Sequence, residues 1–143
     1  MKTTHVLTLD DVRKIAAAAE AEALRNGWVV SIAICDAGGH PLWLQRLDGA
    51  APLTAAVAPA KAHTSAMSGK PSKVHEDMIN KGRTAALCMP IAPLEGGEPI
   101  YANGLVIGAV GVSGVQAAQD AQIARAGIAA LGAGYLYGSS TQS

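Results

Sequence analysis

A lysine and a histidine could do chemistry within one apolar segment of the sequence. Lys61 lies among alanine and valine residues, with no acidic residue within four positions. A lysine in such a helix could hold the carboxylate of a ligand, or act as an amine nucleophile if it is desolvated. It could equally be a solvated lysine whose stem lies along apolar surface. His63 follows, and on a helix its side chain would point about 200° away from that of Lys61. The two would then share a pocket only between helices or subunits.

Two glycine-rich segments are the next candidates, Glu95-Gly96-Gly97 and Gly111-Val112-Ser113-Gly114. Glycines let backbone N–H groups approach a ligand closely, and the second segment leads into the N-terminus of an expected helix. That arrangement suits a carboxylate or another anion. Turn geometry alone would explain the same glycines. Neither segment matches the phosphate-binding patterns G-x-x-x-x-G-K-S/T or G-x-G-x-x-G.

Charged side chains also lie at the turn of the first expected hairpin and at the end of its second strand. Arg46 could grip a carboxylate through two parallel hydrogen bonds, or it could pair with Asp48 or with an acid of another chain. Asp36 begins the turn Asp36-Ala37-Gly38-Gly39, where its carboxylate would accept hydrogen bonds from backbone N–H groups two residues on.

The elements that position these residues follow from periodicity and turn chemistry. Thr8 is expected to cap a helix that ends at Asn26-Gly27. Pro59 leaves the start of the second long helix open, because proline is tolerated best in a first turn, and Ser72 is expected to cap a short polar helix. The further predictions are strands over 28–35, 40–47, 99–102 and 105–113, helices over 53–68, 72–80 and 117–131, a partly extended segment over 84–91, and a fraying end over 132–143.

These elements predict an α+β fold, one antiparallel sheet of about five strands flanked by helices. We see no linker, repeat or low-complexity block in the 143 residues. The prediction is therefore a single domain over 1–143, with its core over about 7–131 and a C-terminal tail over 132–143.

Composition narrows the classes of function. Half of the residues are hydrophobic, 15% are charged, and the mean hydropathy is +0.23. No apolar run reaches the roughly 18 residues of a membrane span, so the surplus apolar surface points to a homo-oligomer. Net charge is zero, phenylalanine is absent and aromatic residues are 3%, which argues against nucleic-acid binding.

Without an export signal, we expect a cytoplasmic protein in which Cys35 and Cys88 are buried thiols.

Five motifs taken together resemble the GlcG/HbpS family, which also includes the C-terminal domain of PduO-type proteins. The resemblance spans about Leu7 to Leu131 and rests on VSIAICDAGG at 30–39, QRLDGA at 45–50, AKAHTSA at 60–66, PLEGGEPI at 93–100 and IGAVGVSG at 107–114. One departure is visible, because the family often has an acidic residue where Ala118 precedes Gln119-Asp120.

The resemblance implies a profilin-like, GlcG-like sheet with flanking helices, and oligomers that are often octamers. Some members bind or handle haem, which needs a strong axial donor. His63 is the candidate ligand of the haem iron, since it alone of the four histidines lies in a family segment on an apolar helix. Lys61 belongs to a family motif and, like Arg46, is a candidate partner of the propionates. Glu95, Gly96, Gly97, Gly111 and Ser113 are the remaining candidate ligand-binding residues.

The alternative function is a small enzyme of a catabolic pathway. It would act on a small carboxylate or oxo-acid at the glycine segments, with Lys61 and Asp36 as acid–base or positioning groups. The resemblance supports this alternative too, because some family members are encoded with catabolic pathways.

Overall fold

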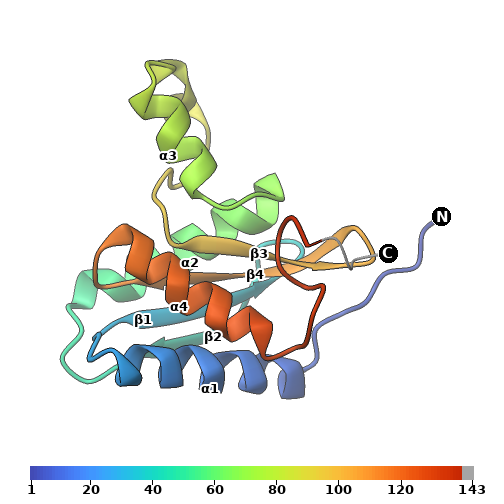
Figure 1. The fold of residues 1–143 in the computed structure, drawn as a ribbon. Helices are drawn as coiled ribbons and strands as arrows, with labels where there is room; N and C mark the ends of the chain where they lie inside the picture. Colours follow the sequence, from blue (N-terminus) through green and yellow to red (C-terminus); the bar gives the residue numbers. More distant parts are fainter. Residues whose placement is uncertain (140–143) are drawn as a thin grey trace.

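The computed structural model describes residues 1–139, and its nine elements alternate between helices and antiparallel hairpins (Figure 1). The elements are α1 (Leu9–Arg25), β1 (Ser31–Asp36), β2 (Pro41–Arg46), α2 (Pro52–Ser68), α3 (Lys73–Asn80), the 3₁₀ helix η1 (Thr84–Cys88), β3 (Gly97–Ala102), β4 (Leu105–Ser113) and α4 (Ala117–Ala129). The α+β class predicted from the sequence is confirmed.

The strands form one antiparallel sheet in the order β2-β1-β4-β3. Ser31 of β1 lies opposite Arg46 on one side and Ser113 on the other, and Gly97 of β3 lies opposite Gly111 of β4. The sheet therefore has four strands, and the expectation of about five is wrong. The segment over 84–91 forms η1 instead, because its backbone bonds are local, from Ala86 N to Arg83 O and from Met89 N to Ala86 O.

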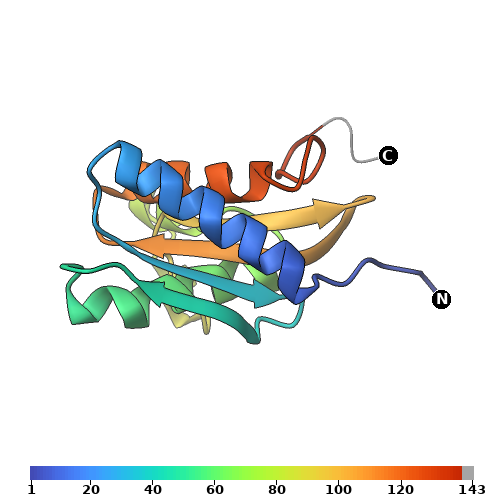
Figure 2. The same ribbon diagram turned by 90° about the horizontal axis from the view of Figure 1, so that it is seen from below.

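Helices cover the two faces of the sheet unequally. Figure 2 shows α1 and α4 side by side on one face, with α2 on the other. Large aliphatic side chains fill the α1–α4 side, among them Ile15, Ile32 and Ile123, each with no exposed surface. The buried apolar cluster on the α2 side consists of small residues: Ala33, Cys35, Ala58, Ala62, Ala66 and Ala109.

Glycines on β3 and β4 let α2 lie directly on the sheet. A Cβ at Gly111 would lie 2.5 Å from the backbone nitrogen of Ala62 and closer still to the carbonyl oxygen of Ala58. A Cβ at Gly97 would meet the carbonyl group of Lys61 and lie 2.7 Å from Ser65 Oγ. Close helix–sheet contact is therefore a sufficient reason for both glycines.

The helix starts agree with the sequence only in part. Thr8 caps α1 as expected, in a capping box with Asp11. The suggestion that α2 starts near Pro59 is wrong, because α2 begins at Pro52 and continues through Pro59. We attribute this to the packing of α2 on the sheet, which outweighs the roughly 3 kcal/mol cost of an interior proline. Ser72 makes no cap bond; its hydroxyl donates to Leu94 O and accepts from Gly97 N.

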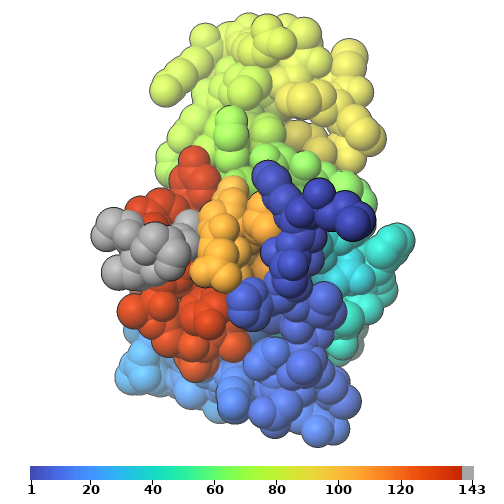
Figure 3. Space-filling view, turned by 90° about the vertical axis from the view of Figure 1, so that its right-hand side faces the viewer, coloured from blue at the N-terminus to red at the C-terminus, as the bar shows by residue number. Residues whose placement is uncertain are grey.

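A lobe formed by residues 69–96, with α3 and η1, stands out from the sheet (Figures 1 and 3). Cys88 is exposed in this lobe, which corrects the expectation of two buried thiols; Cys35 is buried as expected. His75 of α3 is 8% exposed, and within residues 1–139 neither of its ring nitrogens has a hydrogen-bond partner. Burial lowers its pKa, and the nearby charge of Lys70 lowers it further.

The C-terminal segment packs back onto the sheet. Tyr101 N donates to Tyr135 O, and Leu136 forms a bridge with Ile100. The predicted fraying over 132–143 is therefore wrong for 132–139, and residues 140–143 lie outside the described part of the chain. No helix among residues 1–139 has the length and apolar character needed to cross a membrane.

Substituting Gly111→Ala tests the contact between α2 and the sheet. The new methyl group meets backbone atoms of α2, which cannot rotate away as a side chain could. We expect a loss of about 3 kcal/mol or more in the free energy of unfolding, measured by urea denaturation, at the upper end of overpacking costs. Gly82→Ala is the control, because Gly82 has φ +106° but nothing within 4 Å of its Cβ position. It should lose about 1–2 kcal/mol through backbone strain alone, and equal losses in the two variants would contradict the packing argument.

Candidate functional site

The residues singled out from the sequence fall into separate parts of the fold. Lys61 and the glycine segments lie on the sheet side of α2, at one end of the sheet. His63 and Arg46 lie on the outer side of α2 and on the neighbouring strand β2. Asp36 lies at the turn between β1 and β2 and has a structural role as expected, since Oδ1 accepts hydrogen bonds from Gly38 N and His40 N at 2.9 and 3.0 Å.

Lys61 is buried and paired, with 4% of its surface exposed. Its Nζ donates to Asp120 Oδ2 and to Val112 O, each at 2.9 Å. Asp120 Oδ1 also accepts from Val115 N, so the carboxylate joins the start of α4 to α2 and the end of β4. Burial raises the pKa of Asp120, and the hydrogen bond from Lys61 opposes this shift. The solvated-lysine alternative is wrong, and a ligand-holding role for Lys61 stays a prediction that requires this ion pair to open.

The first glycine segment lies directly over this ion pair. Gly96 has φ +131°, and a Cβ there would lie 2.7 Å from Lys61 Nζ. Gly96 and Gly97 are buried, Ser113 is 9% exposed, and Glu95 is half-buried at the surface end of the segment. Sequence reasoning singled out Lys61 but missed Asp120, its partner 59 positions away.

His63 is exposed on the outer side of α2, beside the turn between β1 and β2. Its Nδ1 lies 3.5 Å from the carbonyl oxygen of Gly39. A Cβ on Gly39 would lie 2.5 Å from His63 Nδ1 and 3.3 Å from Met67 Cε, so the imidazole and the thioether both rest against this glycine. The contact with a carbonyl leaves Nε2 as the nitrogen able to bind a metal.

Arg46 lies on the same side of the sheet as α2. It is opposite Ser31 in the register, and Ser31 Oγ contacts Thr54 Oγ1 of α2 at 2.8 Å. Leu44, the next β2 residue on that side, is opposite Ala33 in the core under α2. Arg46 is exposed and Leu44 is 53% exposed, because α2 does not extend over β2.

Together these residues form one open surface, which we call the α2–β2 face. Its members share exposure to solvent and a position along α2 or on the adjacent side of β2: Leu44, Arg46, Leu53, Ala56, His63 and Met67. Leu53 is 71% exposed and Met67 is 47% exposed. Exposed apolar side chains gathered in this way make the face a candidate site for a ligand or a partner.

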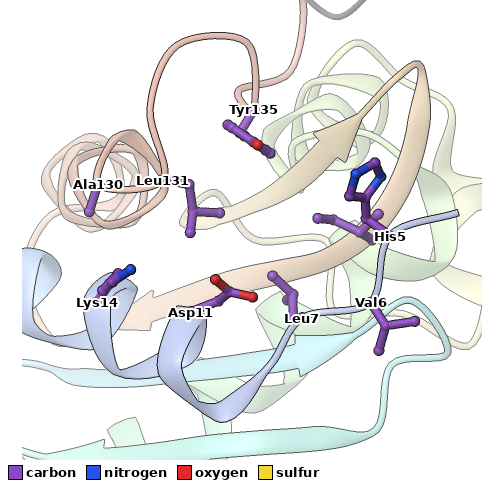
Figure 4. A pocket seen from close by; sticks show the side chains of 9 residues that line it. His5, Val6, Leu7, Asp11, Lys14, Ala130, Leu131 and Tyr135 are labelled. Atoms are coloured by element: carbon purple, nitrogen blue, oxygen red, sulfur yellow. The ribbon is translucent and has the colours of Figure 1, made fainter.

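Another cavity, of about 200 Å³, lies between the N-terminal segment, the start of α1 and the residues that follow α4 (Figure 4). His5, Asp11, Lys14 and Tyr135 supply its polar groups. None of the residues singled out from the sequence lines it. No group of three or more metal-binding side chains occurs within residues 1–139.

Breaking the buried ion pair tests its role in the fold. Lys61→Met leaves the Asp120 carboxylate buried without its cation, and we expect a loss of about 3–5 kcal/mol in the free energy of unfolding. Adding Asp120→Asn removes the unpaired charge and keeps an acceptor for Val115 N, so the double variant should recover at least half of that loss. Lys73→Met is the control: its exposed pair with Asp77 should contribute less than about 1 kcal/mol. A small loss in Lys61→Met, equal to that of the control, would contradict the importance of the buried pair.

Comparisons with known proteins agree with the fold and with the motifs. The family model described as "Haem degrading protein HbpS-like" matches residues 7–129. The protein GlcG of Escherichia coli K12 is 47% identical over 114 residues, which cover 79% of this chain and 85% of GlcG. A crystal structure of a double mutant of HbpS from Streptomyces reticuli has a TM-score of 0.83 at 33% identity, covering 92% of this chain and 91% of that one. A PduOC–haem complex has a TM-score of 0.81 at 26% identity, covering 90% and 96%. The chain belongs to the HbpS-like family, which includes GlcG and HbpS.

Proposed function

We propose that this protein binds haem or a related tetrapyrrole on the α2–β2 face, with His63 as the axial ligand. The observation that carries the proposal is the placement of His63, whose ring is exposed on an apolar surface while Nδ1 faces the Gly39 carbonyl. Histidines that bind metals usually donate their second ring N–H to such an acceptor, which fixes the tautomer and the ring orientation. A haem bound there would supply an iron with an open coordination position for Nε2.

The rest of the face fits a flat apolar ligand. Leu44, Leu53 and Met67 offer exposed aliphatic and thioether surface in place of the phenylalanine that this chain lacks. Arg46 is the strand partner of Ser31, which contacts Thr54 of α2. Thr54 comes nine positions before His63, so Arg46 lies toward the end of α2 that is about 14 Å from His63 along the helix axis. A long arginine side chain at that end is suited to the propionates, which it can bind through two hydrogen bonds.

The relatives support the same function. One structural neighbour was solved as a complex with haem, and the family model carries the description of a haem degrading protein. The enzyme alternative fits the geometry less well, because Lys61 is held by Asp120 and Asp36 by its own turn. We also propose a homo-oligomer, because a second copy over the α2–β2 face would shield the outer side of the ligand from water.

A haem titration followed by visible absorbance tests the axial ligand. Wild-type protein should give a saturable Soret shift with one haem per subunit or per pair of subunits. His63→Ala should alter the absorption maximum and weaken binding about tenfold or more, because the iron loses its nitrogen ligand. His5→Ala, which removes an exposed histidine elsewhere, should behave like wild type. An unsaturable change that is identical in all three proteins would rule out this site.

Esterified haem tests the role of Arg46. Haem dimethyl ester keeps the macrocycle and the iron but lacks the propionate charges. Arg46→Ala should weaken binding of haem about tenfold, the equivalent of one charge-assisted hydrogen bond of roughly 1.4 kcal/mol, and leave binding of the ester unchanged. An equal effect on both ligands would show that Arg46 contributes packing and does not bind the propionates.

A further inference from the structure

A second cleft lies at the base of the lobe, at the β3 edge of the sheet. It has a volume of about 310 Å³ and is lined by Pro71, Lys73, Glu95, Glu98, Arg125, Leu136 and Tyr137. These residues come from the loop before α3, α3 itself, the loop before β3, β3, α4 and the C-terminal segment. The volume is at the lower end of the range for small-molecule pockets, about 300–1,000 Å³.

Charges of both signs line this cleft. Glu98 lies on β3 with 8% of its side chain exposed, and its Oε1 accepts a hydrogen bond from Arg125 Nη1 at 3.0 Å. Burial raises the pKa of Glu98, and Arg125 opposes this shift. Arg125 is 49% exposed, and the bond to Glu98 uses one of the five N–H donors of a guanidinium group. Lys73, at the start of α3, is 51% exposed and pairs with Asp77 at 2.6 Å.

Glu95 is the charged residue of this cleft that has no ion-pair partner among residues 1–139. It is half-buried, and within residues 1–139 it makes no hydrogen bond or ion pair. Tyr137, on another wall of the cleft, is 46% exposed and packs against Tyr101 with ring centroids 5.9 Å apart. A carboxylate and an aromatic ring are two groups that bind an ammonium ion in proteins.

We propose that this cleft binds a small zwitterion of the amino-acid type. Arg125 and Lys73 bind its carboxylate, and Glu95 binds its ammonium group. Two lysine or arginine residues and two glutamates line the cleft, so the lining carries charges of both signs and is neutral overall. A ligand of only one sign would leave groups of the other sign desolvated and unpaired, which costs affinity.

This site is distinct from the proposed haem site. The cleft lies at the β3 edge of the sheet and the α2–β2 face at the β2 edge, with β1 and β4 between them. None of the residues that line the cleft belongs to the α2–β2 face. Failure of either proposal therefore leaves the other untouched.

Isothermal titration calorimetry with the twenty common amino acids, each tested alone at millimolar concentration, tests the proposal. At least one should bind saturably. Its 2-hydroxy-acid analogue, which lacks the ammonium group, and its decarboxylated amine should each bind at least tenfold more weakly. The absence of saturable binding by any of the twenty would overturn the proposal, as would equal binding of an amino acid and its hydroxy acid.

Glu95→Gln identifies the residue responsible. The substitution keeps the side-chain shape and breaks no hydrogen bond or ion pair among residues 1–139, so the fold should be retained, as circular dichroism would verify. Binding of the amino acid should fall at least tenfold, while binding of the hydroxy acid stays the same. Glu20→Gln is the matched control, because Glu20 is also a half-buried glutamate without a partner within residues 1–139 but lies on α1. An equal response of the two variants would show that Glu95 does not bind the ligand.

Discussion

The close contact between α2 and the sheet is the constraint on which the rest of the structure depends. Gly97 and Gly111 are paired across β3 and β4, and the backbone of α2 lies where their side chains would be. Alanines fill the remaining interface. Such packing gains less from apolar area than large side chains would, so its stability depends on good fit and on few voids. It also brings the backbone of α2 near the sheet, and this proximity lets Lys61 reach the carbonyl oxygen of Val112 and the carboxylate of Asp120.

The same contact gives the two sides of α2 different roles. Lys61 faces inward and is neutralised by a carboxylate from α4, which makes a buried cation tolerable. His63 faces outward, as the helical angle between the two positions requires. One short motif therefore supplies the cation of a buried ion pair and an exposed imidazole. The motif does not form a single site, because the side chains of Lys61 and His63 lie on different sides of the helix.

Local signals in the sequence were sufficient for most of the fold. The cap at Thr8 and the turn at Asn103-Gly104, where both residues have positive φ, depend on neighbouring residues only. The prediction of an extended segment over 84–91 was wrong because a short apolar run fits a strand and a 3₁₀ turn equally well. The position of this segment in the lobe decides between the two. The pairing of Lys61 with Asp120 had no local signal either. The sequence could show that Lys61 lacks an acid on its own helix, but not which distant carboxylate the fold would bring to it.

The packing also bears on where the proposed sites lie. Small residues leave little room between α2 and the sheet, and aliphatic side chains fill the opposite face, so the two proposed sites lie at the edges of the sheet. The two edge strands, β3 and β2, differ in whether another segment of the chain covers them. At β3 the C-terminal segment pairs with Ile100 and Tyr101, which covers that edge and helps to form the charged cleft. Within residues 1–139 no strand pairs with the outer side of β2. An uncovered edge strand with exposed leucines favours association with another chain, so a second copy is expected at the β2 edge, where it would also complete the proposed haem site.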